Sequence, residues 1–320
     1  MKRKVRTALA ILVSSGLLAW LLSRLELGPA LDRLSSADAR GLMLGAVFSL
    51  LVLLLRALRF SVLTRAAGLG VTAPAVAIQV FLNRVTPLRL GELSLPLLLR
   101  RHAGEDLAAS LVGLVFVRLL DLAIVVWAIG LALAAAPSGA TRPALLAGSL
   151  GLVVLVATFR HWLGALVRSV RALFARLVDG RWPTAARALD RLLSATLEAR
   201  RLSGRDHAAI ALTSLGIFFG QTAMFGAILS AYGIRLPLLS LVRGSAVVQA
   251  GAALPIAAVG TFGTHEASWV AGFAWVGLPV EEAIVTGVAA QVATLAYAAC
   301  FALLAWLWLS RRRPPALQGN

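Results

Sequence analysis

Long apolar runs separated by short polar segments are the dominant pattern along this chain. Six of the runs reach the length at which a helix crosses a bilayer, which is about 20 residues. They lie at 5 to 23, 41 to 58, 107 to 136, 144 to 159, 207 to 231 and 281 to 309. The pattern predicts an all-α polytopic membrane protein with six full spans.

Two further apolar stretches are interrupted by polar residues. The first is broken between Asn83 and Glu92, which leaves arms of about 12 and 7 residues, too short to span because a helix rises only about 1.5 Å per residue. The second, at about 238 to 278, is broken near Pro255 and again before Glu266. We expect both stretches to form re-entrant hairpins.

The order of span, broken hairpin and span occurs twice along the chain. Its spacing agrees between the halves, since 26 residues separate Glu92 from Arg118 and 25 separate Glu266 from Gln291. The flanks of the two hairpins fall on opposite sides of the membrane when the spans are counted. We therefore expect an inverted repeat, an arrangement typical of transporters, whose sites form at broken helices near the midplane.

Basic residues mark one side of the membrane. Lys and Arg cluster at the N-terminus and at 56 to 65, 100 to 102, 160 to 205 and 311 to 313. All these clusters share one side if the chain starts and ends in the cytoplasm of a prokaryotic inner membrane. We expect a single integral membrane domain, 1 to 320, made of an anchor span (1 to 40), repeat 1 (41 to 136), a connecting span with a cytoplasmic amphipathic segment (144 to 206), repeat 2 (207 to 310) and a cytoplasmic tail (311 to 320).

Composition narrows the classes of function. The 320 residues are 59% hydrophobic and 14% charged, and their mean hydropathy of +0.86 is far above that of soluble domains. The net charge of +17 comes from basic residues between apolar runs, so it indicates topology and anionic lipid, and we expect no nucleic-acid partner. A single cysteine and four scattered histidines form no ligand cluster, and no nucleophile with its base can be assembled. We expect no metal, no cofactor and no enzymatic centre.

Two charged residues lie in the middle of an apolar run. Arg118 and Asp121 are one helical turn apart, and a charge at that depth costs roughly 2.5 to 3.5 kcal/mol, so it normally faces protein, water or substrate. An arm of about 12 residues reaches the same depth. We therefore expect the tip of the first hairpin, with Glu92, to meet this pair. The alternative is a buried ion pair that only joins helices.

The break of the first hairpin is rich in polar and turn-forming residues. They are Asn83, Arg84, Thr86, Pro87, Arg89, Gly91 and Glu92. Non-helical backbone at this depth requires surrounding protein or a wet cavity. With the mid-span pair, three arginines face two carboxylates, and the resulting net charge of +1 suits a phosphate-bearing headgroup. The alternative is that Arg89 and Glu92 neutralise each other while proline and glycine shape the turn.

The second hairpin carries its ionisable residues after its break. His265 and Glu266 follow Gly263, and Gln291 stands in the second repeat where Arg118 stands in the first. Glu266 is a candidate proton or cation switch, and the alternative is a carboxylate that caps the next helix, starting at Ala267. The binding charge is therefore expected in the first repeat.

These motifs together resemble a known family. The segment from Asn83 to Glu92 has the form N-x-x-x-P-x-R-x-G-E. It is followed by Arg118 and Asp121, and later by Pro255, Gly260, Gly263 and Glu266. Over about residues 5 to 310 the chain resembles the flippase-like transmembrane domain of lysylphosphatidylglycerol synthases. The resemblance implies a domain that moves an aminoacylated phospholipid between leaflets, while a separate soluble domain, expected to be absent here, makes that lipid from aminoacyl-tRNA.

The leading hypothesis is a lipid or glycolipid translocase for an anionic headgroup. Its partners would be membrane phospholipids or a glycolipid, together with lipid or polysaccharide synthesis enzymes. The predicted substrate-binding residues are Asn83, Arg84, Pro87, Arg89, Gly91, Glu92, Arg118, Asp121, Gly263, His265, Glu266 and Gln291. The alternatives are a membrane enzyme that acts on a lipid-linked substrate and a non-transporting subunit of a lipid or polysaccharide synthesis system.

Overall fold

Four long helices dominate the described part of the chain. The computed structural model describes residues 36–64, 68–134, 203–253 and 263–312, with a few isolated positions between 143 and 194. The helices long and apolar enough to cross a membrane are α3 (Ala39–Thr64), α6 (Leu107–Ala134), α9 (Gly204–Ala231) and α12 (Val280–Ser310). They confirm four of the predicted spans. The predicted anchor span, the span at 144 to 159 and the amphipathic connector lie outside the described residues.

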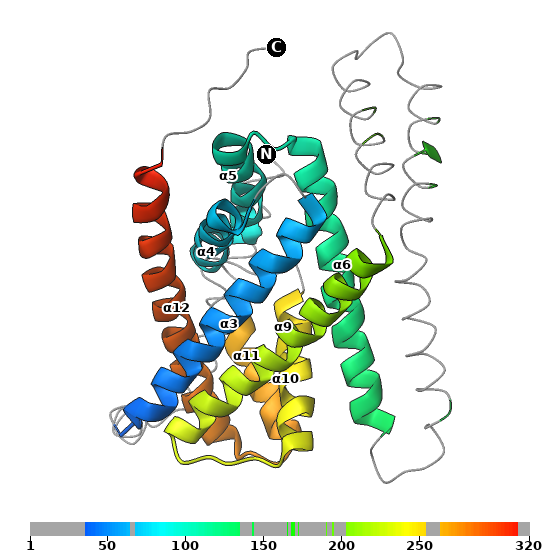
Figure 1. The fold of residues 1–320 in the computed structure, drawn as a ribbon. Coiled ribbons are helices and arrows are strands. Elements are labelled where there is room, and N and C mark those ends of the chain that lie inside the picture. Colours follow the sequence, from blue (N-terminus) through cyan, green and yellow to red (C-terminus); the bar gives the residue numbers. More distant parts are fainter. Residues whose placement is uncertain are drawn as a thin grey trace, which may run out of the picture.

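Shorter helices lie between the long ones in each half. They are α4 (Leu69–Val85), the 3-10 helix η1 (Pro87–Leu93), α5 (Ser94–Ala103), α10 (Leu238–Ala253) and α11 (Thr264–Trp275). The α4–α5 pair lies toward the upper end of the bundle in Figure 1 and the α10–α11 pair toward its lower end. α4 packs on α12, α10 packs on α6, and α3 runs alongside α9. The two halves are therefore interleaved.

The first helix break begins later than the sequence predicted. α4 continues through Asn83 and Arg84 to Val85, and the chain then turns extended at Thr86, with φ −93° and ψ 142°. The reason is Pro87, because a proline ring disfavours helical geometry in the residue before it. The two arms are 17 and 10 residues long, still too short to span. In the second half, α10 ends at Ala253 and α11 begins at Thr264, while Pro255 and Gly260 lie outside the described residues.

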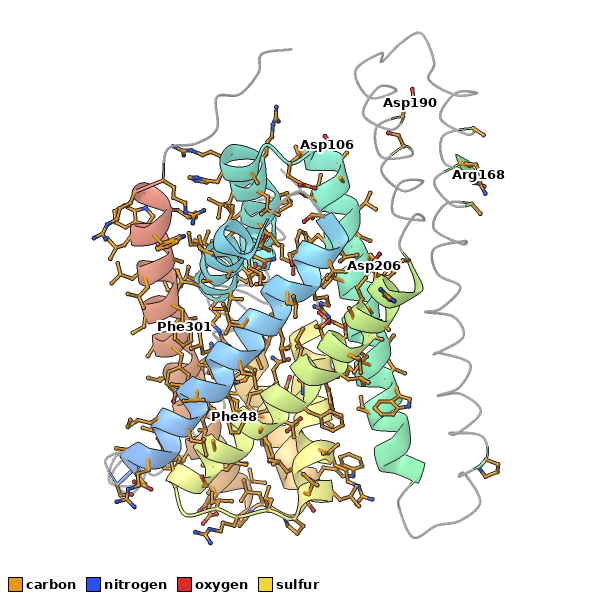
Figure 2. The ribbon with its side chains drawn as sticks, viewed as in Figure 1. Phe48, Asp106, Arg168, Asp190, Asp206 and Phe301 are labelled. Atoms are coloured by element: carbon orange, nitrogen blue, oxygen red, sulfur yellow. The ribbon has the colours of Figure 1, made fainter. Side chains whose placement is uncertain are left out.

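Small residues bring the helices close together. A Cβ on Gly41 would lie 2.7 Å from the Cβ of Ala231, so α3 and α9 approach as closely as they do only because this residue is glycine. Side chains fill the space between the helices, and charged residues such as Asp106 lie at helix ends (Figure 2). Large apolar side chains are exposed on the outer faces, among them Met43 and Leu304. This is the surface of a protein whose solvent is hydrocarbon.

Candidate functional site

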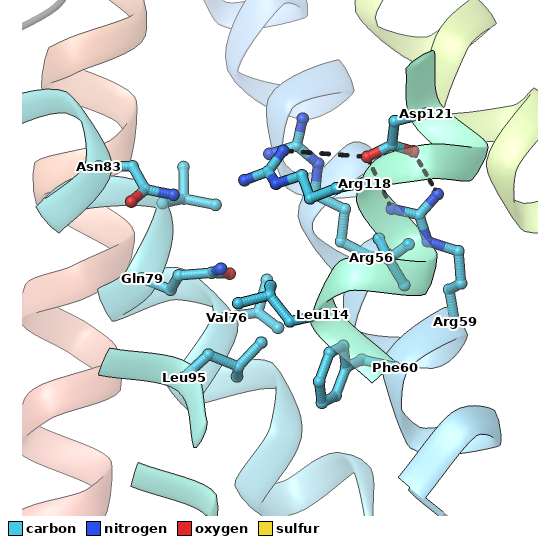
Figure 3. Close-up of a pocket in the computed structure, with 12 residues that line it drawn as sticks. Arg56, Arg59, Phe60, Val76, Gln79, Asn83, Leu95, Leu114, Arg118 and Asp121 are labelled. Carbon is cyan, nitrogen blue, oxygen red and sulfur yellow. Dashed lines mark hydrogen bonds and ion pairs between the residues drawn. The ribbon is translucent and has the colours of Figure 1, made fainter. Parts of the chain in front are cut away.

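Two arginines of α3 lie inside the bundle. Arg56 and Arg59 line a cavity between α3, α4 and α6, and Arg59 is only 2% exposed (Figure 3). The sequence placed both among the basic residues that mark the cytoplasmic side, and in the structure α3 continues past them to Thr64. Their spacing of three residues, which places both on one helix face, was the available signal.

Asp121 is held mainly by Arg59. The two terminal nitrogens of Arg59 donate to the two carboxylate oxygens at 2.5 and 3.2 Å, and Nη1 also donates to Ser214 Oγ on α9 at 2.9 Å. Arg118 Nη1 lies farther away, 3.9 Å from Asp121 Oδ2. The predicted pair of Arg118 and Asp121 is therefore the weaker contact. The two-pronged bond of Arg59 joins three long helices.

Arg118 reaches the tip of the first hairpin. Its Nη2 lies 2.6 Å from Oε1 of Glu92, which belongs to η1. The prediction that the hairpin tip meets the mid-span arginine is confirmed. The two ion pairs differ in exposure, since the Arg118 side chain is 38% exposed and that of Arg59 only 3%. The two arginines thus differ: Arg59 is buried between helices, whereas Arg118 lies where a ligand could reach it.

Gly91 allows the tip to fold back on α4. A Cβ at this position would overlap the backbone nitrogen of Asn83, so no larger residue fits. The Gly91 N–H donates to Thr86 Oγ1 at 2.9 Å, and that hydroxyl donates to the Leu82 carbonyl at 2.6 Å. The side chains of Pro87 and Arg89 lie outside the described residues, so pairing of Arg89 with Glu92 stays a prediction.

The polar residues of the tip divide between two directions. Asn83 lines the cavity with Gln79 from the same helix. Arg84 instead donates from Nη1 to Thr294 Oγ1 on α12, at 2.9 Å. The tip is therefore tied to both halves of the molecule, through Glu92 to α6 and through Arg84 to α12.

The predicted residues of the second half are buried away from this cavity. The His265 ring packs near Phe225 and Trp269, with ring centroids 6.4 and 5.9 Å apart. Glu266 is fully buried, and its Oε2 accepts the Gly263 N–H at 2.7 Å, which caps α11. The helix begins at Thr264 and not at Ala267, because Glu266 acts as its third residue. Of the two roles considered for Glu266 from the sequence, the helix cap is the one that this hydrogen bond supports.

Gln291 is also fully buried, within α12. It does not line the arginine cavity, and neither do Gly263, His265 and Glu266. The structure therefore gathers Asn83, Arg118 and Asp121 at the cavity, with Glu92 bound to Arg118. Arg84 turns instead toward the second half, where its partner Thr294 also donates to the Gln291 carbonyl.

The arginine cavity is small and carries a net positive charge. Its volume is about 40 Å³, room for a few water molecules and not for a lipid headgroup. Three arginines surround it, against Asp121 and the Glu92 carboxylate bound to Arg118, which leaves +1. Its lining is Arg56, Arg59, Phe60, Val76, Gln79, Val80, Asn83, Leu95, Leu114, Val117, Arg118 and Asp121. Within the described ranges no group of three or more His, Cys, Asp or Glu side chains could hold a metal.

Comparison with known proteins gives one match. The family model described as lysylphosphatidylglycerol synthase TM region matches residues 7–302, which include the whole cavity. No curated protein and no solved structure matches the chain.

Proposed function

The chain belongs to the lysylphosphatidylglycerol synthase TM region family, and from this we propose that it is a flippase-like translocase for a lipid or glycolipid with an anionic headgroup. The observation that carries the proposal is the cavity between α3, α4 and α6, where arginines outnumber carboxylates inside an apolar bundle. Buried charge of this kind marks substrate and ion pathways in membrane proteins. The role we propose is transport and not catalysis.

The architecture we propose is an inverted repeat. The α4–η1–α5 and α10–α11 segments are re-entrant hairpins that enter from opposite sides, which the repeated helix order and the interleaved packing support. With the two spans predicted outside the described residues, the chain crosses six times. Both termini then lie in the cytoplasm of a prokaryotic inner membrane, next to enzymes of lipid or polysaccharide synthesis.

The first hairpin tip is the moving part in this proposal. The cavity as described is too small for a headgroup, so α6 and the tip must separate for a lipid to enter. The bond between Arg118 and Glu92 is the contact that must break, and its partial exposure keeps its strength to about 1 kcal/mol or less. The freed Arg118 then holds the headgroup phosphate, and Arg84 and Arg89 take part as the tip moves.

The carboxylates have distinct roles in this cycle. Asp121 remains bound to Arg59 and balances the charge of the empty site. Glu266 is the proposed proton or cation switch, because its second oxygen, Oε1, is buried with no hydrogen bond within the described residues while Oε2 caps α11. A proton or cation bound there would weaken the cap and loosen the start of that helix.

Reconstituted vesicles test the proposal. The purified chain is placed in phosphatidylcholine vesicles with fluorescent phospholipids and glycolipids, and crossing is followed by chemical quenching of the outer leaflet. We expect the protein to speed crossing, Arg118→Ala to abolish the gain, and Arg40→Ala to leave it intact. Arg40 is the matched control because it lies exposed at the start of α3, outside the cavity. Crossing no faster than in empty vesicles would overturn the proposal.

A further inference from the structure

Arg56 differs from the other arginines of the cavity. Arg59 is bound to Asp121 and Arg118 to Glu92. Arg56 also lines the cavity, yet within the described part of the chain its side chain makes no hydrogen bond or ion pair. It lies within electrostatic range of Asp121 and of three other arginines. Asp121 and Glu92 are already paired with Arg59 and Arg118, so no ion pair neutralises the charge of Arg56 within the described residues.

The position of Arg56 makes that charge significant. From Arg56 to the end of α3 at Thr64 is eight residues, about 12 Å along the helix axis. A guanidinium at such depth is unfavourable without a counter-charge, and a second guanidinium nearby increases the penalty. An anion that binds between them removes both penalties. A site that gains so much from an anion is expected to bind one.

The geometry gives that anion a place. In Figure 3 the guanidinium groups of Arg56 and Arg118 lie on one side of Asp121, and Arg59 lies on the other. The amides of Gln79 and Asn83 come from α4 on the opposite wall of the cavity. Two guanidinium groups and two amides are a donor set typical of phosphate recognition.

We propose that Arg56 and Arg118 together bind the phosphodiester of a lipid headgroup, and that Glu92 holds Arg118 until the phosphate replaces it. The inference rests on the proposed function and adds to it the role of Arg56 and the exchange of Glu92 for the phosphate. The three arginines that line the cavity and the two carboxylates beside them leave a net charge of +1, which a singly charged phosphodiester neutralises.

Binding of a short-chain lipid tests the role of Arg56. Dihexanoyl-phosphatidylglycerol is titrated into the full-length protein in detergent and followed by calorimetry. Arg56→Gln should weaken binding by about 10- to 100-fold, the effect of losing one charge-assisted contact. Arg56→Lys keeps the charge without the planar guanidinium, so its affinity for the lipid should lie between those of the wild type and Arg56→Gln. Arg40→Gln, which removes an exposed arginine from the same helix, should bind like the wild type.

Glu92→Gln tests the exchange by a gain of affinity. Removing the carboxylate frees Arg118, so binding should strengthen about 2- to 5-fold, the value of a partly exposed ion pair. Such a gain does not result from misfolding, so this variant and Arg56→Lys decide the matter where Arg56→Gln fails to fold. Inorganic phosphate, titrated in parallel, should bind more weakly than the lipid.

The outcomes separate this inference from the translocase itself. Wild-type affinity in Arg56→Gln, no gain in Glu92→Gln, or equal binding of inorganic phosphate would each overturn the phosphodiester site. If the wild type moves lipid in vesicles while Arg56→Gln binds normally, the site is wrong and the translocase stands. If the variants behave as expected and no lipid crosses, the site stands and translocation is wrong.

Discussion

Replacing Arg59 by methionine should destabilise the fold more than any other single change in the cavity. The change removes the two bonds to Asp121 and the bond to Ser214. Breaking a buried ion pair from one side costs about 3 to 5 kcal/mol of unfolding free energy. We expect the lower value, about 3 kcal/mol, because Arg118 lies 3.9 Å from the remaining carboxylate and can compensate in part.

A double-mutant cycle separates this pair from its surroundings. Unfolding is followed by titration with SDS, using the fluorescence of the chain's eight tryptophans. The double variant Arg59→Met, Asp121→Leu should lose far less unfolding free energy than the two single variants together, because both charges are removed at once. Arg118→Met, in the exposed pair, should lose only about 1 kcal/mol or less. Additive losses in the double variant, or an equal loss in Arg118→Met, would refute the assignment of Arg59 as the structural arginine.

Three further changes test other parts of the structure. Gly91→Ala should lower the melting temperature, whereas Gly68→Ala, where a Cβ meets open space, should not. Equal melting temperatures of the two variants would contradict the need for glycine at position 91. Thr294→Val removes the acceptor of Arg84 and should lower the unfolding free energy in SDS by about 1.5 kcal/mol. An unchanged unfolding free energy would contradict a stabilising role for this hydrogen bond. Glu105 lies before α6, outside the spans, and burial raises its pKa from 4.5 to about 7. The folded state then holds its proton more tightly than the unfolded chain, so thermal stability should fall as the pH rises from 4.5 to 7. Glu105→Gln should flatten that slope, and an unchanged slope would contradict the assignment.

The spans and the first break were predictable because each has a local cause. The last span, predicted at 281 to 309, is observed as Val280–Ser310, since bilayer thickness fixes the length of an apolar run. The break near Pro87 follows from the geometry of proline. The close approach of Gly91 to α4, by contrast, is visible only in the structure. The meeting of Glu92 with Arg118 followed from helix rise alone.

The partners of the charges were not predictable in the same way. Arg59 and Asp121 are 62 residues apart in sequence, and no local pattern states which of several arginines will reach a given carboxylate. Arg56 was assigned to the end of a span because an apolar run was taken to end near its first charges. Its place in the cavity depends on how α3 packs against α4 and α6, which is a property of the assembled bundle.

Photocrosslinking tests most directly whether a headgroup enters the cavity. A phospholipid with a diazirine on its headgroup is mixed into vesicles that contain the full-length protein, and the labelled residues are mapped by mass spectrometry. The account predicts label on the cavity residues Gln79, Asn83 and Val117, and its loss in Arg118→Gln. Label confined to exposed side chains such as Leu122 and Val126, or the same cavity label in Arg118→Gln, would contradict it.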